Sequence, residues 1–467
     1  MPETPIFERK ITRVERLFTR SPFSLVTMVA RIKGSVTEQA LRQAILQVQR
    51  RHTHLRVRIR EDHEHTPYFT SEGAGDIPVE VVARESDEHW MQVQQEASQV
   101  PFEFEQQPAI RFILVYSPAI SELVILCHHI LCDGLSLAYL ARDILLQLGD
   151  PARVVEALPD PHPIDLDNLP QGLSQSGLVR YFIQRINRQW QADPTYFDQE
   201  DYRDLAAAYW QHFHHEMIPV ELSEAETTAL VERCRAEGVT VNSALAIAFA
   251  GAQVSVQGPR PFHSSIFIAG SLRDRLPSPP GEAMGFYAGS VTLKYRYDES
   301  ESFWENARRF HRKARPLFTD KNLFKEFLSW FYLEPAILEA LNFKKLGGLV
   351  PAQAARHAKL AAFSQKDDVV ATILKREKMD SLERQHIGTA VTNLTRMDFP
   401  RKYGALELDR LILHPGGAFP LVNVNLVLGA VTCAGKLSLV LEFAREALDM
   451  QTAGNIRDKA LEYLLAG

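Results

Sequence analysis

Apolar and polar residues in the first third of the chain alternate between strand-like and helix-like patterns. The dense apolar run Phe23–Ile32 predicts a strand, and a helix with apolar residues at i, i+4 and i+7 follows from the N-cap Thr37. Two more strands are predicted over 109–116 and 122–127, the second apolar on both faces and therefore buried. A helix over 135–148 follows them. These patterns predict a first unit in which helices pack on a sheet.

Residues 150–173 are rich in Pro and Asp and have no apolar period, so we interpret them as the crossing between two halves. The second half starts with the capping box Ser223-x-x-Glu226, which begins a helix. Strands are expected over 264–269, 290–297, 391–394, 406–413, 422–431 and 437–443, and helices over 242–254, 303–315, 321–343 (broken at Pro335) and the C-terminus. Both halves therefore mix strands and helices.

The length of the chain supports this division. With 467 residues the chain is long for a single core and fits two domains of roughly 200 residues each. We predict an α/β (α+β) class with two lobes, the first over 1–170 and the second, with the crossing segment, over 171–467.

Composition excludes several classes of function. Hydrophobic residues make up 45% and charged residues 24%, as in ordinary globular proteins, and the net charge of −6 argues against nucleic-acid binding. No run of about 18 apolar residues predicts a membrane span, and Met1–Arg20 lacks a signal-type apolar stretch. Four scattered cysteines do not form a disulfide framework. We therefore expect a cytoplasmic protein with a small or medium-sized substrate.

Chemistry-bearing residues gather at the end of the second buried strand. His128 and His129 end that strand, and Asp133 and Gly134 mark a tight turn before the next helix. Imidazole has a pKa close to operating pH, and a well-placed general base contributes about 10² to 10⁴ in rate. In an arbitrary protein a single histidine after a strand is more often structural, so context has to decide between the two interpretations.

The seven residues from His128 to Gly134 match the His-His-x-x-x-Asp-Gly signature of the chloramphenicol acetyltransferase-like superfamily, and Ser136 and an apolar helix follow as is common there. This superfamily includes nonribosomal peptide condensation domains and alcohol acyltransferases. The resemblance implies two acetyltransferase-like lobes that form a pseudo-dimer around a central cleft. It also implies that His129 is the catalytic base, while His128 braces the loop.

Further matches are less specific. The segment Arg51–Arg56 resembles the condensation-domain pattern Arg-His-x-x-Leu-Arg, and in the family an arginine forms a structural pair with the motif aspartate. Here Arg51 and Arg56 are both candidates for the pair with Asp133, and a solvated basic strand edge is an equally good interpretation of either. Ser271-Leu272-Arg273, followed by 285–289, resembles the family's arginine-containing turn.

The second half offers one more candidate for the site. Thr392-Asn393-Leu394 resembles a Thr-Asn-Leu-Gly stretch of phthiocerol dimycocerosyl transferase-like members, with Thr395 in place of the glycine. Asn393 and Ser136 are therefore the substrate-binding candidates. The backbone N–H of Gly134 and the Asn393 side chain are candidate donors to the oxyanion of the tetrahedral intermediate.

Other chemistries fit the same region less well. Several potential metal ligands crowd the loop, but adjacent residues at a strand end point to opposite faces, and no sequence feature brings His212-x-x-His215 to them, so we expect no metal. Cys132 as a nucleophile would need exposure and a partner base, and packing is the simpler interpretation. The basic run 308–315 is typical of a solvated helix face, with the phosphates of coenzyme A or an acidic carrier protein as alternative partners.

The resemblance implies a free-standing, monomeric acyltransferase without a cofactor, which moves an acyl group from coenzyme A or a carrier-bound phosphopantetheine to the hydroxyl of a natural product or lipid. The chain lacks the glutamine-containing opening motif of peptide-forming domains and shows Arg13–Leu17 in its place, which favours ester formation. An amide-forming condensation enzyme and a non-catalytic carrier-binding member are the alternatives. The sequence does not determine the acyl chain, the acceptor, or whether coenzyme A or a carrier protein holds the acyl group.

Overall fold

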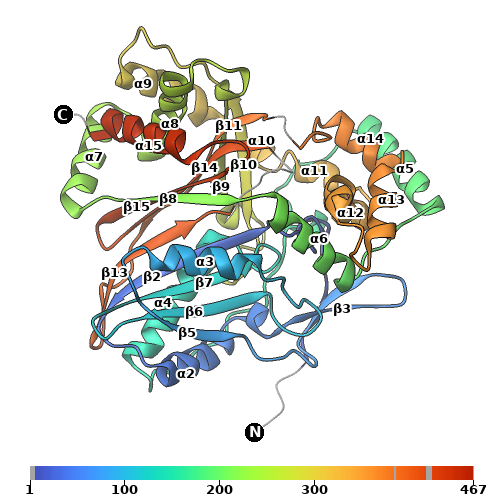
Figure 1. The fold of residues 1–467 in the computed structure, drawn as a ribbon, viewed down its shortest axis with the longest axis horizontal. Coiled ribbons are helices and arrows are strands. Elements are labelled where there is room, and N and C mark those ends of the chain that lie inside the picture. Colours follow the sequence, from blue (N-terminus) through green and yellow to red (C-terminus); the bar gives the residue numbers. More distant parts are fainter. Residues whose placement is uncertain (1–5, 383–384, 417–422, 466–467) are drawn as a thin grey trace.

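The computed structural model describes residues 6–382, 385–416 and 423–465. Two six-stranded sheets stack against each other and helices cover their outer faces, with a third, mainly helical region at one end (Figure 1). The α/β class with two lobes is confirmed. Within the described ranges no single helix is long and apolar enough to cross a membrane; α7 and α8 pass that test only as a pair, with a 96° bend between them.

The sheet of the first lobe has the order β12-β13-β2-β7-β6-β5. Its strands are β12 (Lys402–Tyr403), β13 (Leu406–His414), β2 (Leu25–Lys33), β7 (Ile120–His128), β6 (Ile110–Tyr116) and β5 (Val79–Ala83). Helix α4 (Gly134–Gly149) packs on β2 and on α2 (Glu38–Gln49), while α3 (His89–Gln99) packs on β6 and β7. The strands and helices predicted for this lobe are confirmed to within two residues. Strand β7 is buried on both faces, as its apolar run predicts.

The sheet of the second lobe has the order β10-β9-β11-β14-β15-β8. Its strands are β10 (Ala288–Lys294), β9 (Ser265–Ser271), β11 (Ile387–Met397), β14 (Val424–Cys433), β15 (Lys436–Ala444) and β8 (His215–Glu221). Its helices are α7 (Glu224–Ala236), α8 (Val241–Gln257), α9 (Phe303–Ala314) and α15 (Met450–Leu465). The capping box of Ser223 and Glu226 begins α7 as predicted. Val422, the first residue of one predicted strand, lies outside the described residues.

Strand β13 crosses from the second half of the chain into the first lobe. Its residues Leu408–His414 pair antiparallel with Thr27–Ile32 of β2, so the sheet of the first lobe is built from both ends of the sequence. The same strand contacts β14 and β15 of the other sheet. The domain boundary near residue 170 stays a prediction. Strands β12 and β13 come after it in the sequence but belong to the sheet of the first lobe.

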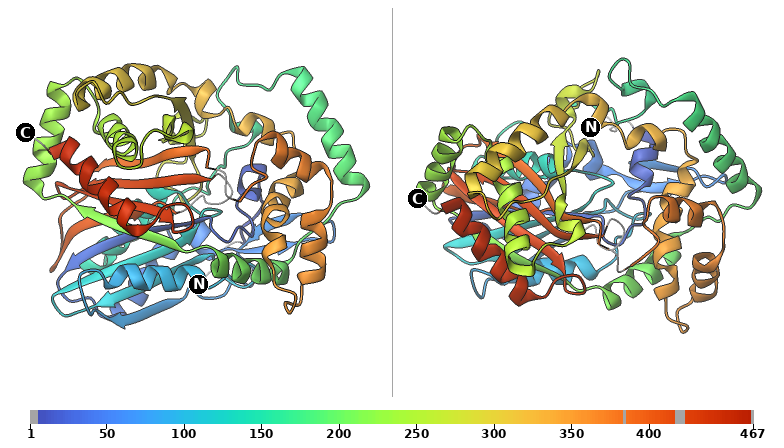
Figure 2. Two further views of the ribbon diagram at one scale, coloured as in Figure 1. Left: turned by 45° about the horizontal axis from the view of Figure 1, so that its top comes forward. Right: turned by 90° about the horizontal axis from the view of Figure 1, so that it is seen from above.

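The third region is the part that sequence patterns predicted least. It contains α5 (Gly177–Ala192), α6 (Gln199–His212), α11 (Phe327–Trp330), α12 (Pro335–Leu346), α13 (His357–Gln365) and α14 (Val369–Arg376), with the short α10 (Asp320–Leu323) beside it. The long helix expected over 321–343 forms three pieces, and Pro335 starts α12 at its first turn instead of kinking a continuous helix. In Figure 2, α5 lies at the outer edge of this region.

Several histidines, among them His54, His128 and His414, are buried in neutral form, and this makes the fold sensitive to acid. Burial lowers the pKa of His128 to about 3 and the pKa values of His54 and His414 to about 4, from an ordinary 6.5. Below pH 6.5 the unfolded chain binds protons that the folded chain does not, so stability falls by about 1.4 kcal/mol per pH unit for each histidine. Urea unfolding at about pH 7 and about pH 5 should therefore show a marked loss of free energy of unfolding. His414→Asn should weaken this dependence, and an unchanged free energy over that range would contradict the assignment.

Candidate active site

The motif loop runs from the end of β7 to the start of α4. Asp133 is the N-cap of α4: its Oδ1 accepts hydrogen bonds from the backbone N–H of Ser136 at 2.8 Å and from the Ser136 hydroxyl at 2.8 Å. This capping box explains why Asp and Ser stand three positions apart, since each satisfies a backbone donor that the first helical turn leaves free. The loop is thereby fixed at its helical end.

His128 uses its whole ring to hold the loop. Its Nε2–H donates to the carbonyl of Ser21 at 3.0 Å, and its Nδ1 accepts from the backbone N–H of Ile130 at 3.3 Å. Phe102 and Phe104 meet the ring edge-on, and the side chain is fully buried. With both nitrogens engaged and its pKa far below neutral, His128 is not available to a substrate.

His129 is held differently and keeps one nitrogen available. Its backbone N–H donates to the carbonyl of Ser24 at 2.8 Å, and its Nδ1–H donates to the carbonyl of Cys132 at 3.1 Å. Because a carbonyl only accepts, the ring is the Nδ1–H tautomer and Nε2 carries the lone pair. In the part of the chain that the structure describes, Nε2 has no hydrogen-bond partner. Desolvation lowers the pKa of His129, against the raising effects of the Cys132 carbonyl and the Asp133 charge.

The ring of His129 is only half-buried and lies where the two lobes meet. Phe18, which precedes β2, packs against it at a centroid distance of 5.4 Å, and Phe286, which precedes β10, meets it edge-on at 5.6 Å. The two phenylalanines also contact each other at 4.6 Å. This setting favours the neutral base form and orients the imidazole between the halves. Phe286 lies in the segment 285–289 noted in the sequence, but neither its contact with His129 nor that of Phe18 could be predicted from local pattern.

The partner of Asp133 is Arg273, which corrects the prediction of Arg51 or Arg56. The guanidinium of Arg273 donates to Asp133 Oδ1 at 2.9 Å and to the Ser136 hydroxyl at 2.7 Å. Its other nitrogen donates to the carbonyls of Gly281 and Ala283. Asp133 Oδ2 accepts the backbone N–H of Tyr287 at 3.1 Å. The pair is almost fully buried and joins the motif loop of the first lobe to the second lobe.

The segment 51–56 contacts the motif loop through His54, and neither of its candidate arginines pairs with Asp133. Arg51 pairs with Asp143 at 2.7 Å and with Glu282 at 2.7 Å, one helical stretch away from the motif. His54 Nδ1–H donates to the carbonyl of Leu131 at 3.1 Å and so helps to fix the motif loop. No ion pair joins Arg56 to a carboxylate among the described residues. The reason is geometric, because the 3₁₀ turn Thr53–Arg56 presents His54 to the loop.

Ser136 is not placed to touch a substrate, contrary to the prediction. The residue is fully buried, and its hydroxyl donates to Asp133 and accepts from Arg273 and from the backbone N–H of Gly285. All of its hydrogen-bonding capacity is used between the lobes. Its position two residues after Gly134 reflects helix capping and the attachment of the loop to the second lobe.

Gly134 and β11 approach each other closely. A Cβ on Gly134 would lie 3.0 Å from Leu394 Cδ2, so the glycine leaves room for the strand. Asn393, next along β11, accepts the backbone N–H of Thr395 at 2.7 Å, and Thr395 has the rarely adopted φ of 63°. Asn393 also lines a cavity of about 880 Å³ in the second lobe, together with His311 and Arg315 among others. The roles of Gly134 and Asn393 toward an oxyanion stay predictions.

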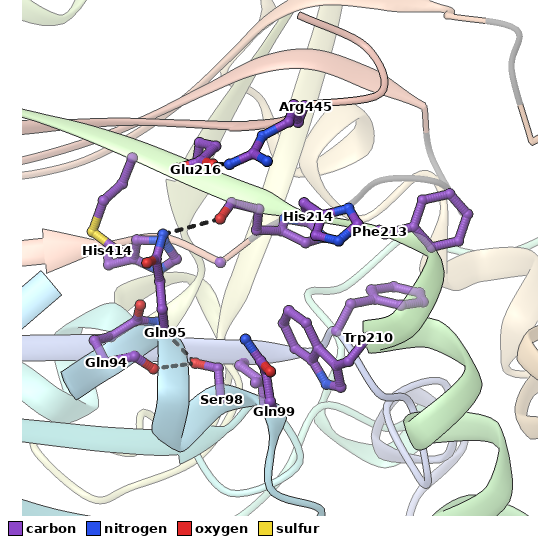
Figure 3. Close-up of a pocket in the computed structure, with 15 residues that line it drawn as sticks. Gln94, Gln95, Ser98, Gln99, Trp210, Phe213, His214, Glu216, His414 and Arg445 are labelled. Atoms are coloured by element: carbon purple, nitrogen blue, oxygen red, sulfur yellow. Dashed lines mark hydrogen bonds and ion pairs between the residues drawn. The ribbon is translucent and has the colours of Figure 1, made fainter. Parts of the chain in front are cut away.

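A second, smaller cavity of about 170 Å³ lies between the lobes (Figure 3). Phe23 and Leu25 line it, together with Trp210 of α6, which Figure 3 labels. Phe23 and Leu25 flank Ser24, whose carbonyl accepts the backbone N–H of His129. The cavity therefore borders the segment that holds the backbone of the base.

A buried hydrogen-bonded chain ties the walls of this smaller cavity together. His215 of β8 donates from Nδ1 to Glu442 of β15, and its Nε2 accepts the hydroxyl proton of Tyr209 in α6. Glu442 is only 2% exposed, so this chain serves packing between the sheet and the helical region. Of the histidines at 212–215, His215 thus has a packing role.

The cysteines and potential metal ligands show no second reactive centre in the described ranges. Cys132 is fully buried, and burial raises the pKa of its thiol well above 9.0, so it is not a thiolate at neutral pH. In residues 6–382, 385–416 and 423–465, no three His, Cys, Asp or Glu side chains lie close enough together to hold a metal ion.

Comparisons with known proteins agree with this geometry. Residues 2–147 match the family model of the condensation domain. The trichothecene 15-O-acetyltransferase TRI3 of Fusarium sporotrichioides superposes with a TM-score of 0.64 at 11% identity, over 99% of this chain and 96% of that one. The first condensation domain of the CDA synthetase gives 0.59 at 14% identity, over 98% and 96%. Polyketide synthase associated protein 5 from Mycobacterium tuberculosis gives 0.58 at 13% identity, over 97% of each chain. A sequence comparison with curated proteins gives no match. The fold of the whole chain is that of condensation domains, with two acetyltransferase-like lobes.

Proposed function

We propose that this chain, which has the fold of condensation domains over its length and matches their family model over residues 2–147, transfers an acyl group from a thioester to a hydroxyl acceptor, with His129 as general base. The observation that carries the proposal is the tautomer of His129. The Cys132 carbonyl fixes the proton on Nδ1 and leaves the Nε2 lone pair free between the lobes. A base held in this way needs no rearrangement before it accepts a proton.

The reaction follows from that arrangement. Nε2 takes the proton of the acceptor hydroxyl while the oxygen attacks the thioester carbonyl, and the C–O bond forms. The tetrahedral oxyanion collapses, the C–S bond breaks, and the imidazolium returns the proton to the departing thiolate. No acyl-enzyme forms, because holding both reactants in line removes much of the entropic barrier. Gly134 and Asn393 are the candidate oxyanion donors, and one such donor contributes about 10² to 10³ in rate.

The cavity in the second lobe supports the proposal that the acyl donor carries a negatively charged group. It extends beside β11 and is bordered by Arg315 and His311 of the basic run. Arg308 and Arg309 of that run are paired with Glu237 and Glu301, which fits a structural role for these two. The remaining three, Arg312, Lys313 and Arg315, have no carboxylate partner among the described residues. We propose that they attract the phosphates of coenzyme A or the acidic surface of a carrier protein.

Ester and amide formation are separated by experiment. The enzyme is incubated with acyl thioesters and with matched alcohol and amine acceptors, free thiol is followed, and the product is weighed by mass spectrometry. Ester products would support the proposed reaction. Turnover with amines alone would favour an amide-forming condensation enzyme, and thiol release without a dependence on any acceptor would contradict both.

The pH dependence of kcat/KM should follow the protonation of His129 in the enzyme without bound substrate. Because desolvation lowers its pKa below the ordinary 6.5, the neutral base dominates at pH 7 and activity is lost only on further acidification. We expect kcat/KM to be flat from about pH 8 to about pH 7 and then to fall tenfold per unit, with a midpoint below 6.5. Initial rates at low substrate concentration measure this. A midpoint above 6.5 would show that another group titrates.

A further inference from the structure

Helix α5 leaves an apolar surface uncovered. Its inner face packs on α11 and α14, while Leu178, Tyr181 and Phe182 on its outer side are 68%, 57% and 48% exposed. These three side chains lie within five positions of one another at the N-terminal half of the helix. Single exposed apolar residues are common on soluble proteins, but a cluster with two aromatic rings on one helix marks an interaction surface.

The same helix is strongly basic. It contains Arg180, Arg185 and Arg188 and no acidic residue, so it carries three positive charges in a chain whose net charge is −6. All three arginines are exposed, and in the described part of the chain none lies within ion-pair distance of a carboxylate. On neighbouring α14, by contrast, Lys375 pairs with Asp367. The guanidinium of Arg180 lies over the ring of Tyr332 at 5.6 Å, and no carboxylate of the described residues neutralises the three positive charges of α5.

We propose that the outer face of α5 binds the surface of a lipid bilayer that contains anionic lipids. Leu178, Tyr181 and Phe182 would enter the boundary between headgroups and acyl chains, and the arginines would contact lipid phosphates. A helix with a basic polar face and aromatic and aliphatic residues beside it is the form that lies in a membrane interface. Arginine stems also cover apolar surface while their charged ends reach the headgroups.

Shape and charge favour a bilayer over a protein partner. The helix is a convex ridge at the outer edge of the molecule, as the two views of Figure 2 show, and a ridge suits a deformable surface. The whole chain is negatively charged and is repelled by an anionic surface, so binding to such a surface depends on a local basic patch. An acidic carrier protein is the alternative partner, and the experiment below distinguishes it.

The test is sedimentation of the full chain with vesicles of phosphatidylcholine alone and of phosphatidylcholine with one third phosphatidylglycerol. We expect binding to the anionic vesicles, weakened by high salt. The triple variant Arg180→Gln/Arg185→Gln/Arg188→Gln should lower the partition coefficient by about fivefold per arginine, and so on the order of a hundredfold in all. Failure of the wild-type chain to sediment with the anionic vesicles would overturn the proposal.

Two further variants make the result specific. Leu178→Ser/Phe182→Ser should also reduce binding, while Arg42→Gln/Arg50→Gln/Arg233→Gln removes the same charge from exposed sites elsewhere and should leave binding unchanged. Equal losses in the two arginine triples would overturn the assignment to α5, as would binding to an acidic carrier protein without binding to vesicles. Thermal unfolding confirms that each variant folds. No turnover is measured, so this result is independent of the proposed acyl transfer.

Discussion

Replacing His129 by alanine is expected to lower kcat/KM by about 10² to 10⁴, the range for the loss of a general base. The variant keeps the capping box, Arg273 and the candidate oxyanion donors, so the remaining rate reflects orientation and electrostatic stabilisation. Stability should change little, because the ring is half-buried and, among the described residues, its side chain forms a hydrogen bond only with the Cys132 carbonyl. Rates are measured as thiol release at low substrate concentration, beside a thermal melt.

A matched control is available in His212, whose ring forms a hydrogen bond with the carbonyl of Ala208. His212→Ala removes an imidazole of the same size at a site remote from the motif and should leave kcat/KM within a factor of about two. Equal activity of wild type and His129→Ala would remove His129 from the mechanism. Equal loss in both variants would indicate a general effect on folding.

The second large effect is expected at the buried pair between the lobes. Arg273→Ala leaves Asp133 charged and without its cation in a buried site, and breaking such a pair costs about 3 to 5 kcal/mol. The variant also loses the bonds to the Gly281 and Ala283 carbonyls. We therefore expect a large loss of free energy of unfolding in urea. We also expect a fall in kcat, because among the described residues only the hydrogen bonds to the backbone of Tyr287 and Gly285 then hold the motif loop to the second lobe.

The double variant Asp133→Asn/Arg273→Gln tests the pairing directly. It removes both charges together and should recover part of the stability that either single change loses, so that the cycle gives a coupling energy of about 1 to 3 kcal/mol. Arg51→Ala is the comparison, since Arg51 pairs with Asp143 and Glu282 at a partly exposed site. Equal costs for Arg51→Ala and Arg273→Ala, or strict additivity in the cycle, would contradict the central role of Arg273.

Much of the fold could be predicted from local patterns. Strand β7 and helix α4 were expected because an apolar run and a helical apolar period are properties of the local sequence. The motif loop could be recognised because the residues of the His-His-x-x-x-Asp-Gly signature are contiguous, while the capping box of Asp133 and Ser136 became apparent only in the structure. Pro335 was recognised as a helix breaker, but the pattern did not show that it begins a helix.

Contacts between distant parts of the chain could not be predicted in this way. The turn at Arg273 was noticed, yet nothing local links it to Asp133, which lies on the other lobe and 140 positions earlier. Phe18 and Phe286 flank His129 only because two loops meet there. Helices α5 and α6 were not predicted, although α5 has the apolar period of an amphipathic helix. Local pattern specifies elements, while the choice of partners depends on packing across the lobes.

The position of β13 has a consequence for the order in which the protein is made. Thr27 of β2 pairs with His414, so the first sheet receives an inner strand only after the chain has been synthesised to beyond His414. Until then the edge of β2 is open to wrong pairing, and closing so long a loop is slow. Synthesis of the first half alone should therefore yield an insoluble fragment, whereas supplying the C-terminal segment in trans would complete the sheet.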